Sequence, residues 1–107
     1  MTEFVRACSV ADIADGKPFR VDIGDVPIVM VKDKHGTYAL YDECTHAAVA
    51  LSEGDVDHGS IECWLHGSRF DLATGKPKSL PATQPVQVFP TRIDGDDVFV
   101  ALGEITA

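Results

Sequence analysis

The chain of 107 residues lacks several features that mark broad classes of protein. It contains no asparagine, so it offers no acceptor for N-glycosylation. The longest purely apolar run in its middle, residues 47–51, is far shorter than a membrane span. The N-terminus has no basic start followed by an apolar stretch, which predicts that there is no signal peptide. We therefore expect one cytoplasmic domain covering residues 1–107.

Basic residues are also scarce. Nine Lys and Arg against seventeen Asp and Glu give a formal net charge of −8, which argues against nucleic acid and anionic membranes as partners. Between Lys34 and Arg69 there is no Lys or Arg, and that stretch holds Asp42, Glu43, Glu53, Asp55, Asp57 and Glu62. This acidic segment is either a solvated face that maintains solubility or a docking surface for a basic partner.

Sustained helical periodicity is missing as well. One helical turn is predicted at residues 10–14, after Ser9 as a possible N-cap. Short β-rich runs separated by glycine-containing turns make up the rest, and they indicate an all-β sandwich or small barrel. The expected strands are 4–8, 19–23, 28–32, 37–41, 60–62, 69–71, 86–91 and 98–102.

Cysteine is rare and unevenly placed. Cys44-x-His46 and Cys63-x-x-His66, with sixteen residues between them, each pair one thiolate with one imidazole. A Rieske centre is a [2Fe–2S] cluster with two Cys on one iron and two His on the other, and it needs this mixed donor set. A single tetrahedral zinc could take the same four ligands, although zinc modules usually group like residues together.

The third cysteine, Cys8, is left without a partner if Cys44 and Cys63 bind iron. No intrachain disulfide is then possible, which fits a reducing cytosol. We predict that Cys8 is a small buried hydrophobic residue in the first strand. The two ligand pairs are expected on loops that follow strands 37–41 and 60–62, with a third loop at residues 80–82 able to close over them.

These residues resemble a known family. Cys44-Thr45-His46 together with Cys63-Trp64-Leu65-His66-Gly67-Ser68 is similar to the signature of soluble Rieske-type ferredoxins, and the similarity continues to about Leu102. The resemblance implies three antiparallel sheets with a small cluster-binding subdomain at about residues 43–82. It also implies one [2Fe–2S] cluster per chain, held by Cys44, His46, Cys63 and His66.

The resemblance further suggests how the cluster is tuned. High-potential relatives carry a disulfide across the site, where this chain has Val49 and Leu65. They also use a Ser and a Tyr as hydrogen-bond donors to sulfur, where this chain has Ser68 and Phe70. Fewer donors favour the oxidised state, so we expect a potential near the low end of the Rieske range, roughly −150 mV. Trp64, Leu65 and Pro81 are expected around the cluster, with Trp64 and Leu65 shielding it from water or contacting a partner.

Ferredoxins of this kind carry single electrons to the terminal component of bacterial non-haem iron oxygenases, such as aromatic-ring dioxygenases. Because no G-x-G-x-x-G motif is present, a separate flavin-dependent reductase must supply the electron. We expect a monomeric carrier that is not itself an enzyme. An alternative acceptor is the machinery of iron–sulfur cluster assembly. A nitrite-reductase small subunit and a structural zinc module are the alternatives from other classes.

Overall fold

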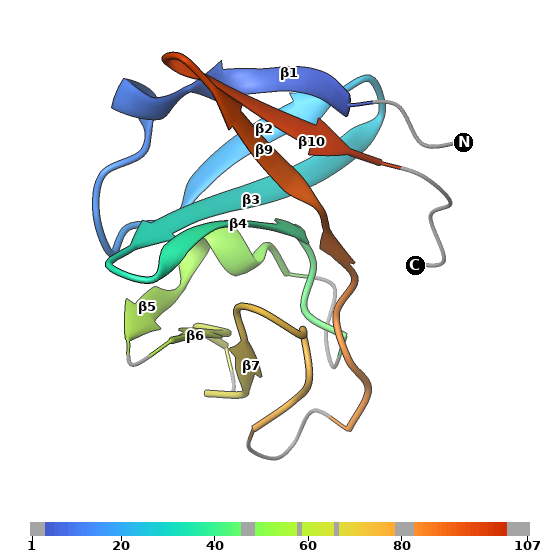
Figure 1. Cartoon of the computed structure of the whole chain (residues 1–107). Helices are drawn as coiled ribbons and strands as arrows, with labels where there is room; N and C mark the ends of the chain where they lie inside the picture. The colour runs from blue at the N-terminus through green and yellow to red at the C-terminus, as the bar shows by residue number, and fades with distance from the viewer. Residues whose placement is uncertain (1–3, 46–48, 58, 66, 79–82, 103–107) are drawn as a thin grey trace.

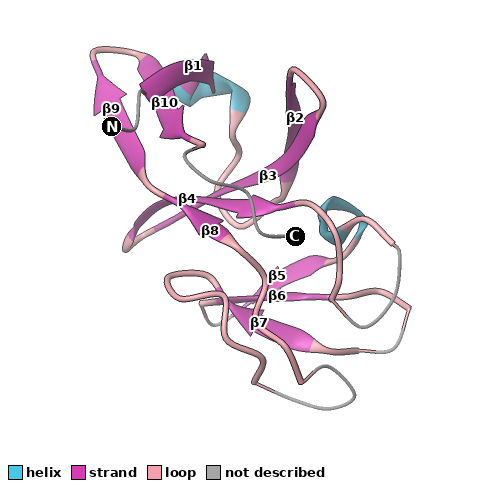
Figure 2. Cartoon of the chain, turned by 90° about the vertical axis from the view of Figure 1, so that its right-hand side faces the viewer, coloured by secondary structure: helices cyan, strands magenta, loops and turns pink. Residues whose placement is uncertain are grey.

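The computed structural model describes residues 4–45, 49–57, 59–65, 67–78 and 83–102. Within them the chain forms three antiparallel sheets and no α-helix (Figures 1 and 2). Sheet A has the order β1-β10-β9, sheet B the order β2-β3-β4-β8, and sheet C the order β5-β6-β7. The strands are β1 Phe4–Ser9, β2 Phe19–Ile23, β3 Val26–Asp33, β4 Gly36–Tyr41, β5 Asp55–Asp57, β6 Ser60–Glu62, β7 Arg69–Asp71, β8 Val88–Phe89, β9 Thr91–Asp94 and β10 Asp97–Ala101. The predicted all-β class is therefore confirmed.

Strand β3 is the central element of the molecule. Successive side chains on a strand point to opposite faces, and here both faces are buried. Val29 and Val31 enter one hydrophobic cluster, while Ile28 and Met30 enter a second one. The first cluster contains residues of sheets B and C, and the second contains residues of sheets A and B. Sheet B thus lies between the other two and contributes to both cores (Figures 1 and 2).

Sheet C is small and one-sided. Its register places Val56, Ile61 and Phe70 in one row across the three strands, and these residues form or contact the core shared with sheet B. The adjacent row is Asp55, Glu62 and Arg69, on the opposite face. This alternation covers the apolar row with sheet B and leaves the charged row facing outward.

Most predicted strands are confirmed, with two differences. The expected strand 86–91 is wrong, because the segment forms β8 in sheet B and β9 in sheet A, with Pro90 between them. Proline lacks the N–H that a continuous ladder requires, so the chain changes sheets there. Strand β5 was not predicted, because its residues are polar at two of three positions. The helical turn is the 3-10 helix η1 Val10–Asp12, whose N-cap Ser9 forms a capping box with Asp12.

A second 3-10 helix, η2 Leu51–Glu53, was not predicted and lies between the two ligand pairs in sequence. Its Leu51 is fully buried in the core shared by sheets B and C. No helix among the described residues has the length and apolar character needed to cross a membrane.

Candidate metal centre

Two buried cysteines mark the candidate metal centre. Cys44 follows strand β4 and Cys63 follows strand β6, so they come from different sheets. The residues are 3% and 0% exposed, and both belong to the hydrophobic cluster between sheets B and C. Neither cysteine forms a disulfide. Folding therefore brings together two thiols that lie nineteen positions apart in the sequence.

The two cysteine loops close in the same way. The Cys44 N–H donates to the Val49 carbonyl at 2.9 Å, and the Cys63 N–H donates to the Ser68 carbonyl at 2.7 Å. Each bond joins a cysteine to the residue five positions further on. In the second loop Gly67, at φ 74°, also donates its N–H to the Cys63 carbonyl at 2.9 Å. Both cysteines thus begin a short loop whose ends are joined by a backbone hydrogen bond.

A third segment supports these loops. The Thr45 hydroxyl donates to the Gln84 carbonyl at 2.7 Å, which ties the first cysteine loop to the chain before β8. The Val86 N–H donates to the Gly75 carbonyl at 2.8 Å, which ties the turn after β7 to the same chain. Gly75 has a φ of 76°, and a Cβ there would overlap the Val86 carbonyl. The segment before β8 therefore joins the first cysteine loop to the turn after β7.

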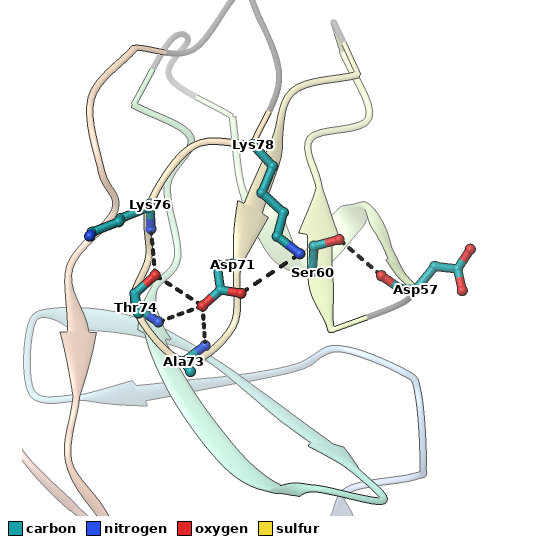
Figure 3. Close-up of polar contacts among 7 residues, drawn as sticks. All are labelled: Asp57, Ser60, Asp71, Ala73, Thr74, Lys76 and Lys78. Atoms are coloured by element: carbon teal, nitrogen blue, oxygen red, sulfur yellow. Dashed lines mark hydrogen bonds and ion pairs between the residues drawn. The ribbon is translucent and has the colours of Figure 1, made fainter.

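The turn after β7 is held by Asp71, as Figure 3 shows. Its Oδ2 accepts from the Ala73 N–H, the Thr74 N–H and the Thr74 hydroxyl at 2.9–3.1 Å, and its Oδ1 lies 3.7 Å from the Lys78 ammonium. Burial acts to raise the pKa of Asp71, but these hydrogen bonds and the Lys78 charge outweigh it and lower the pKa.

The other predicted site residues divide into three groups. His46, His66 and Pro81 lie outside the described residues. Ser68 is fully buried directly before β7. Trp64 and Leu65 are 53% and 42% exposed, so they form an apolar surface beside Cys63 rather than part of the core. Their exposure favours the partner-contact interpretation over the shielding one.

The acidic segment is not uniform. Glu43, Glu53, Asp55 and Asp57 are exposed, as a solvated or docking face requires. Asp42 is instead buried, with its side chain at 0% exposure. Asp42 therefore belongs to neither a solvated nor a docking face, because the Ser52 backbone and hydroxyl and the Arg20 guanidinium surround it. Only the fold shows this, since the partners lie in two other elements.

A cavity of about 350 Å³ opens beside Cys44. It is lined by Tyr41, Glu43, Cys44, Thr45, Pro85, Val86 and Gln87. The cavity gives one face of the first cysteine loop access to solvent, while Cys63 is enclosed.

The described donors fit an iron–sulfur cluster. Two thiols that form no disulfide belong to one apolar core, at the start of two backbone-bonded loops, and thiolate sulfur is the usual ligand of such clusters. The described residues contain no group of three or more His, Cys, Asp or Glu able to hold a metal. Two thiols alone would complete neither a Rieske cluster nor a tetrahedral zinc site. Both kinds of site also need the two predicted imidazoles.

Cys8, in contrast, has no place in this site. It is 4% exposed and lies in the second hydrophobic cluster, between sheets A and B. Burial first and the charge of Asp12 second raise the pKa of its thiol, despite the opposing charge of Arg6. A raised pKa keeps the thiol protonated and unreactive, so the prediction of a small buried hydrophobic residue is confirmed.

Comparisons with known proteins agree with this geometry. The family model of the Rieske [2Fe-2S] domain matches residues 3–90. The 3-phenylpropionate/cinnamic acid dioxygenase ferredoxin subunit of Escherichia coli (strain K12) is 38% identical over 102 residues, which are 94% of each chain. Among solved structures, the ferredoxin of Sphingomonas yanoikuyae B1 is 30% identical with a TM-score of 0.87, and the match covers 92% of this chain and 98% of that one.

A further similar structure is a complex of reduced oxygenase and oxidized ferredoxin in carbazole 1,9a-dioxygenase. The match has 37% identity and a TM-score of 0.85, and it covers 91% of this chain and 100% of that one. The chain therefore belongs to the Rieske [2Fe–2S] domain family and carries one [2Fe–2S] cluster. Within that family it is a Rieske-type ferredoxin, an electron-transfer component rather than a catalytic subunit. This excludes the zinc alternative that the ligand pattern left open.

Proposed function

We propose that this ferredoxin is a monomeric cytoplasmic carrier that accepts one electron from a flavin-dependent reductase and passes it to the terminal oxygenase of an aromatic-ring dioxygenase system. The observation that carries the proposal is the convergence of Cys44 and Cys63, on matching loops, in one buried cluster. The names of the similar proteins, a dioxygenase ferredoxin subunit and a ferredoxin bound to an oxygenase, support the choice of acceptor.

In this proposal Cys44 and Cys63 bind one iron, and His46 and His66 bind the other. The cluster supplies reversible one-electron exchange. The chain's own residues hold it in place and limit its contact with water. Cys63 and Ser68 are fully buried, whereas Trp64 and Leu65 present an exposed apolar surface next to Cys63. Such a surface suits brief contact with a partner.

A cysteine series tests the ligand assignment. Cys44→Ala and Cys63→Ala are each expected to abolish the rhombic EPR signal of the dithionite-reduced protein and to lower iron from two per chain toward zero. Cys8→Ala is the matched control, because it removes an equally buried thiol from the other core. It is expected to keep the signal and to cost about 1 kcal/mol of stability. Loss of the signal in all three variants, or in none, would contradict the assignment.

The acceptor is tested with purified components. The reduced ferredoxin is mixed in a stopped-flow instrument with the terminal oxygenases of the phenylpropionate and carbazole dioxygenase systems, and cluster reoxidation is followed by absorbance. Fast, saturable reoxidation by either one supports an aromatic-ring dioxygenase partner. A ferredoxin that is inert to both, yet is reoxidised by an iron–sulfur cluster assembly scaffold, would move the protein to that pathway.

A further inference from the structure

Asp42 forms a buried polar anchor beside the first cysteine loop. Its Oδ1 accepts the Ser52 N–H at 2.7 Å, and its Oδ2 accepts the Ser52 hydroxyl at 2.6 Å. A guanidinium nitrogen of Arg20 lies 3.6 Å from Oδ2. The backbone N–H of Asp42 donates to the Pro27 carbonyl at 3.0 Å. The Ser52 and Arg20 contacts give the carboxylate the donors that a buried charge requires.

The anchor joins three parts of the molecule. Arg20 lies on β2 of sheet B, and Ser52 lies in η2, between the two cysteine loops. Asp42 directly follows β4 and precedes Cys44 by two residues. The Cα atoms of Asp42 and Cys44 are therefore at most about 7 Å apart. The Asp42 side chain therefore attaches the first cysteine loop both to sheet B, through Arg20, and to η2, through Ser52.

We propose that Asp42 is a positioning residue that also lowers the reduction potential of the centre, with Arg20 opposing it. Reduction adds one negative charge at the cluster. A buried carboxylate close to a ligand disfavours that charge, and a nearby guanidinium favours it. Water screens the Asp42 charge little, because its side chain is 0% exposed, whereas Arg20 is 48% exposed and acts more weakly. The inference concerns the cluster assigned above and does not depend on the identity of the acceptor.

Four variants separate the effect of the Asp42 charge on the reduction potential from the effect of holding the loop in position. Asp42→Asn removes the negative charge and nearly keeps the shape. Arg20→Gln removes the positive charge and leaves Asp42 and Ser52 in place. Ser52→Ala removes one hydrogen bond without changing any charge. Asp97→Asn is the control, because it removes an ion-paired carboxylate on β10 of sheet A, away from the centre. Each cluster-loaded protein is titrated potentiometrically with EPR detection, and iron and sulfide are counted.

The expected results differ in sign. Asp42→Asn should make reduction more favourable by about tenfold in the equilibrium constant, a rise of about 59 mV for a one-electron couple. Arg20→Gln should shift the equilibrium in the opposite direction, by a smaller factor. Ser52→Ala and Asp97→Asn should change it less than twofold. If Asp42→Asn does not retain a cluster, the downward shift of Arg20→Gln carries the test on its own.

Other patterns would overturn the proposal. Shifts of the same sign in Asp42→Asn, Arg20→Gln and Ser52→Ala would show that the anchor only holds the loop. An unchanged potential in both charge variants would show that the buried pair does not act on the centre. A wild-type protein without a Rieske EPR signal would instead contradict the cluster assignment itself, so the two failures are distinguishable.

Discussion

Single carboxylates, Asp42 fully buried and Asp71 half-buried, hold segments close to this metal centre. Asp42 supports the first cysteine loop, and Asp71 holds the turn after the second one. In both cases a carboxylate accepts backbone and hydroxyl hydrogen bonds and lies near one cation. Charge-assisted hydrogen bonds of this kind are stronger than neutral ones. The first cysteine loop and the turn after β7 are therefore ordered by the side chains of Asp42 and Asp71.

Asp71 makes stability depend on pH. Its folded-state pKa is lowered from the ordinary 3.8, so its contribution is complete above that value and is lost as the pH falls through the folded pKa. Asp71→Asn is expected to destabilise the protein by about 1–2 kcal/mol at pH 7. The difference from wild type should shrink below about pH 4. Thermal unfolding of the cluster-containing wild type and variant from pH 3 to 7 measures this difference in stability.

The control for this prediction is Asp25→Asn, which changes an exposed carboxylate in the turn between β2 and β3. It should leave stability within about 0.5 kcal/mol of wild type at every pH. A gap between Asp71→Asn and wild type that stays constant in acid would contradict the electrostatic explanation.

At the scale of elements, close backbone approaches hold the small sheet C and its turns against their neighbours. Gly54, before β5, packs so near the Glu62 carbonyl that a Cβ would overlap it. Gly75 packs equally near the Val86 carbonyl and also needs a positive φ. Three-residue strands have few ladder bonds of their own. Their place relative to the cysteine loops thus depends on these contacts.

Gly75→Ala is expected to loosen the connection between the turn after β7 and the segment before β8. The positive φ alone costs roughly 1–2 kcal/mol, and the overlap with Val86 should bring the loss to about 3 kcal/mol or more. Gly95→Ala is the matched control, with a φ of 63° and open space around the added Cβ. Urea unfolding compares the two. Equal losses of unfolding free energy in the two variants would show that the close packing of Gly75 against the Val86 carbonyl is unimportant.

At the scale of the whole molecule, charge is divided between two ends. Sheet C, whose strand β6 leads into Cys63, carries the exposed Asp55 and Asp57 on β5. Sheet A lies at the opposite end (Figures 1 and 2), and its β9–β10 hairpin carries Asp94 at the end of β9 and Asp96 in the turn. With a net charge of −8 the protein as a whole attracts basic partners, but only acidic residues near the site can orient them.

Electron transfer to the oxygenase is therefore expected to slow with ionic strength, because salt screens the steering charges. The second-order rate constant should fall roughly tenfold between 50 and 500 mM NaCl. Asp55→Asn with Asp57→Asn should slow the reaction at low salt, whereas Asp94→Asn with Asp96→Asn should not. Stopped-flow reoxidation compares the pairs, which lose the same charge. If both double variants slow electron transfer equally, the rate depends on the net charge of the protein and not on where the carboxylates lie.

Local sequence accounts for much of this protein. The strands β2, β6 and β7 have the predicted bounds, because alternating or β-rich runs end there at glycine-containing turns. The ligand pattern also predicted the Rieske family, since mixed Cys and His donors at short spacing serve few other chemistries. Membership in that family is confirmed, and the assignment of the four ligands stays a prediction.

Contacts between distant segments decided the rest. Only the tertiary structure places Asp42 inside the protein, because Arg20 and Ser52 lie far from each other in sequence. Only the structure divides residues 86–91 between two sheets and exposes Trp64 and Leu65 beside Cys63. Periodicity reports which local conformation a segment prefers, whereas burial and ion pairing depend on what packs against it. The sequence by itself therefore determined the fold class and the chemistry of the centre, and the tertiary structure determined its electrostatic surroundings.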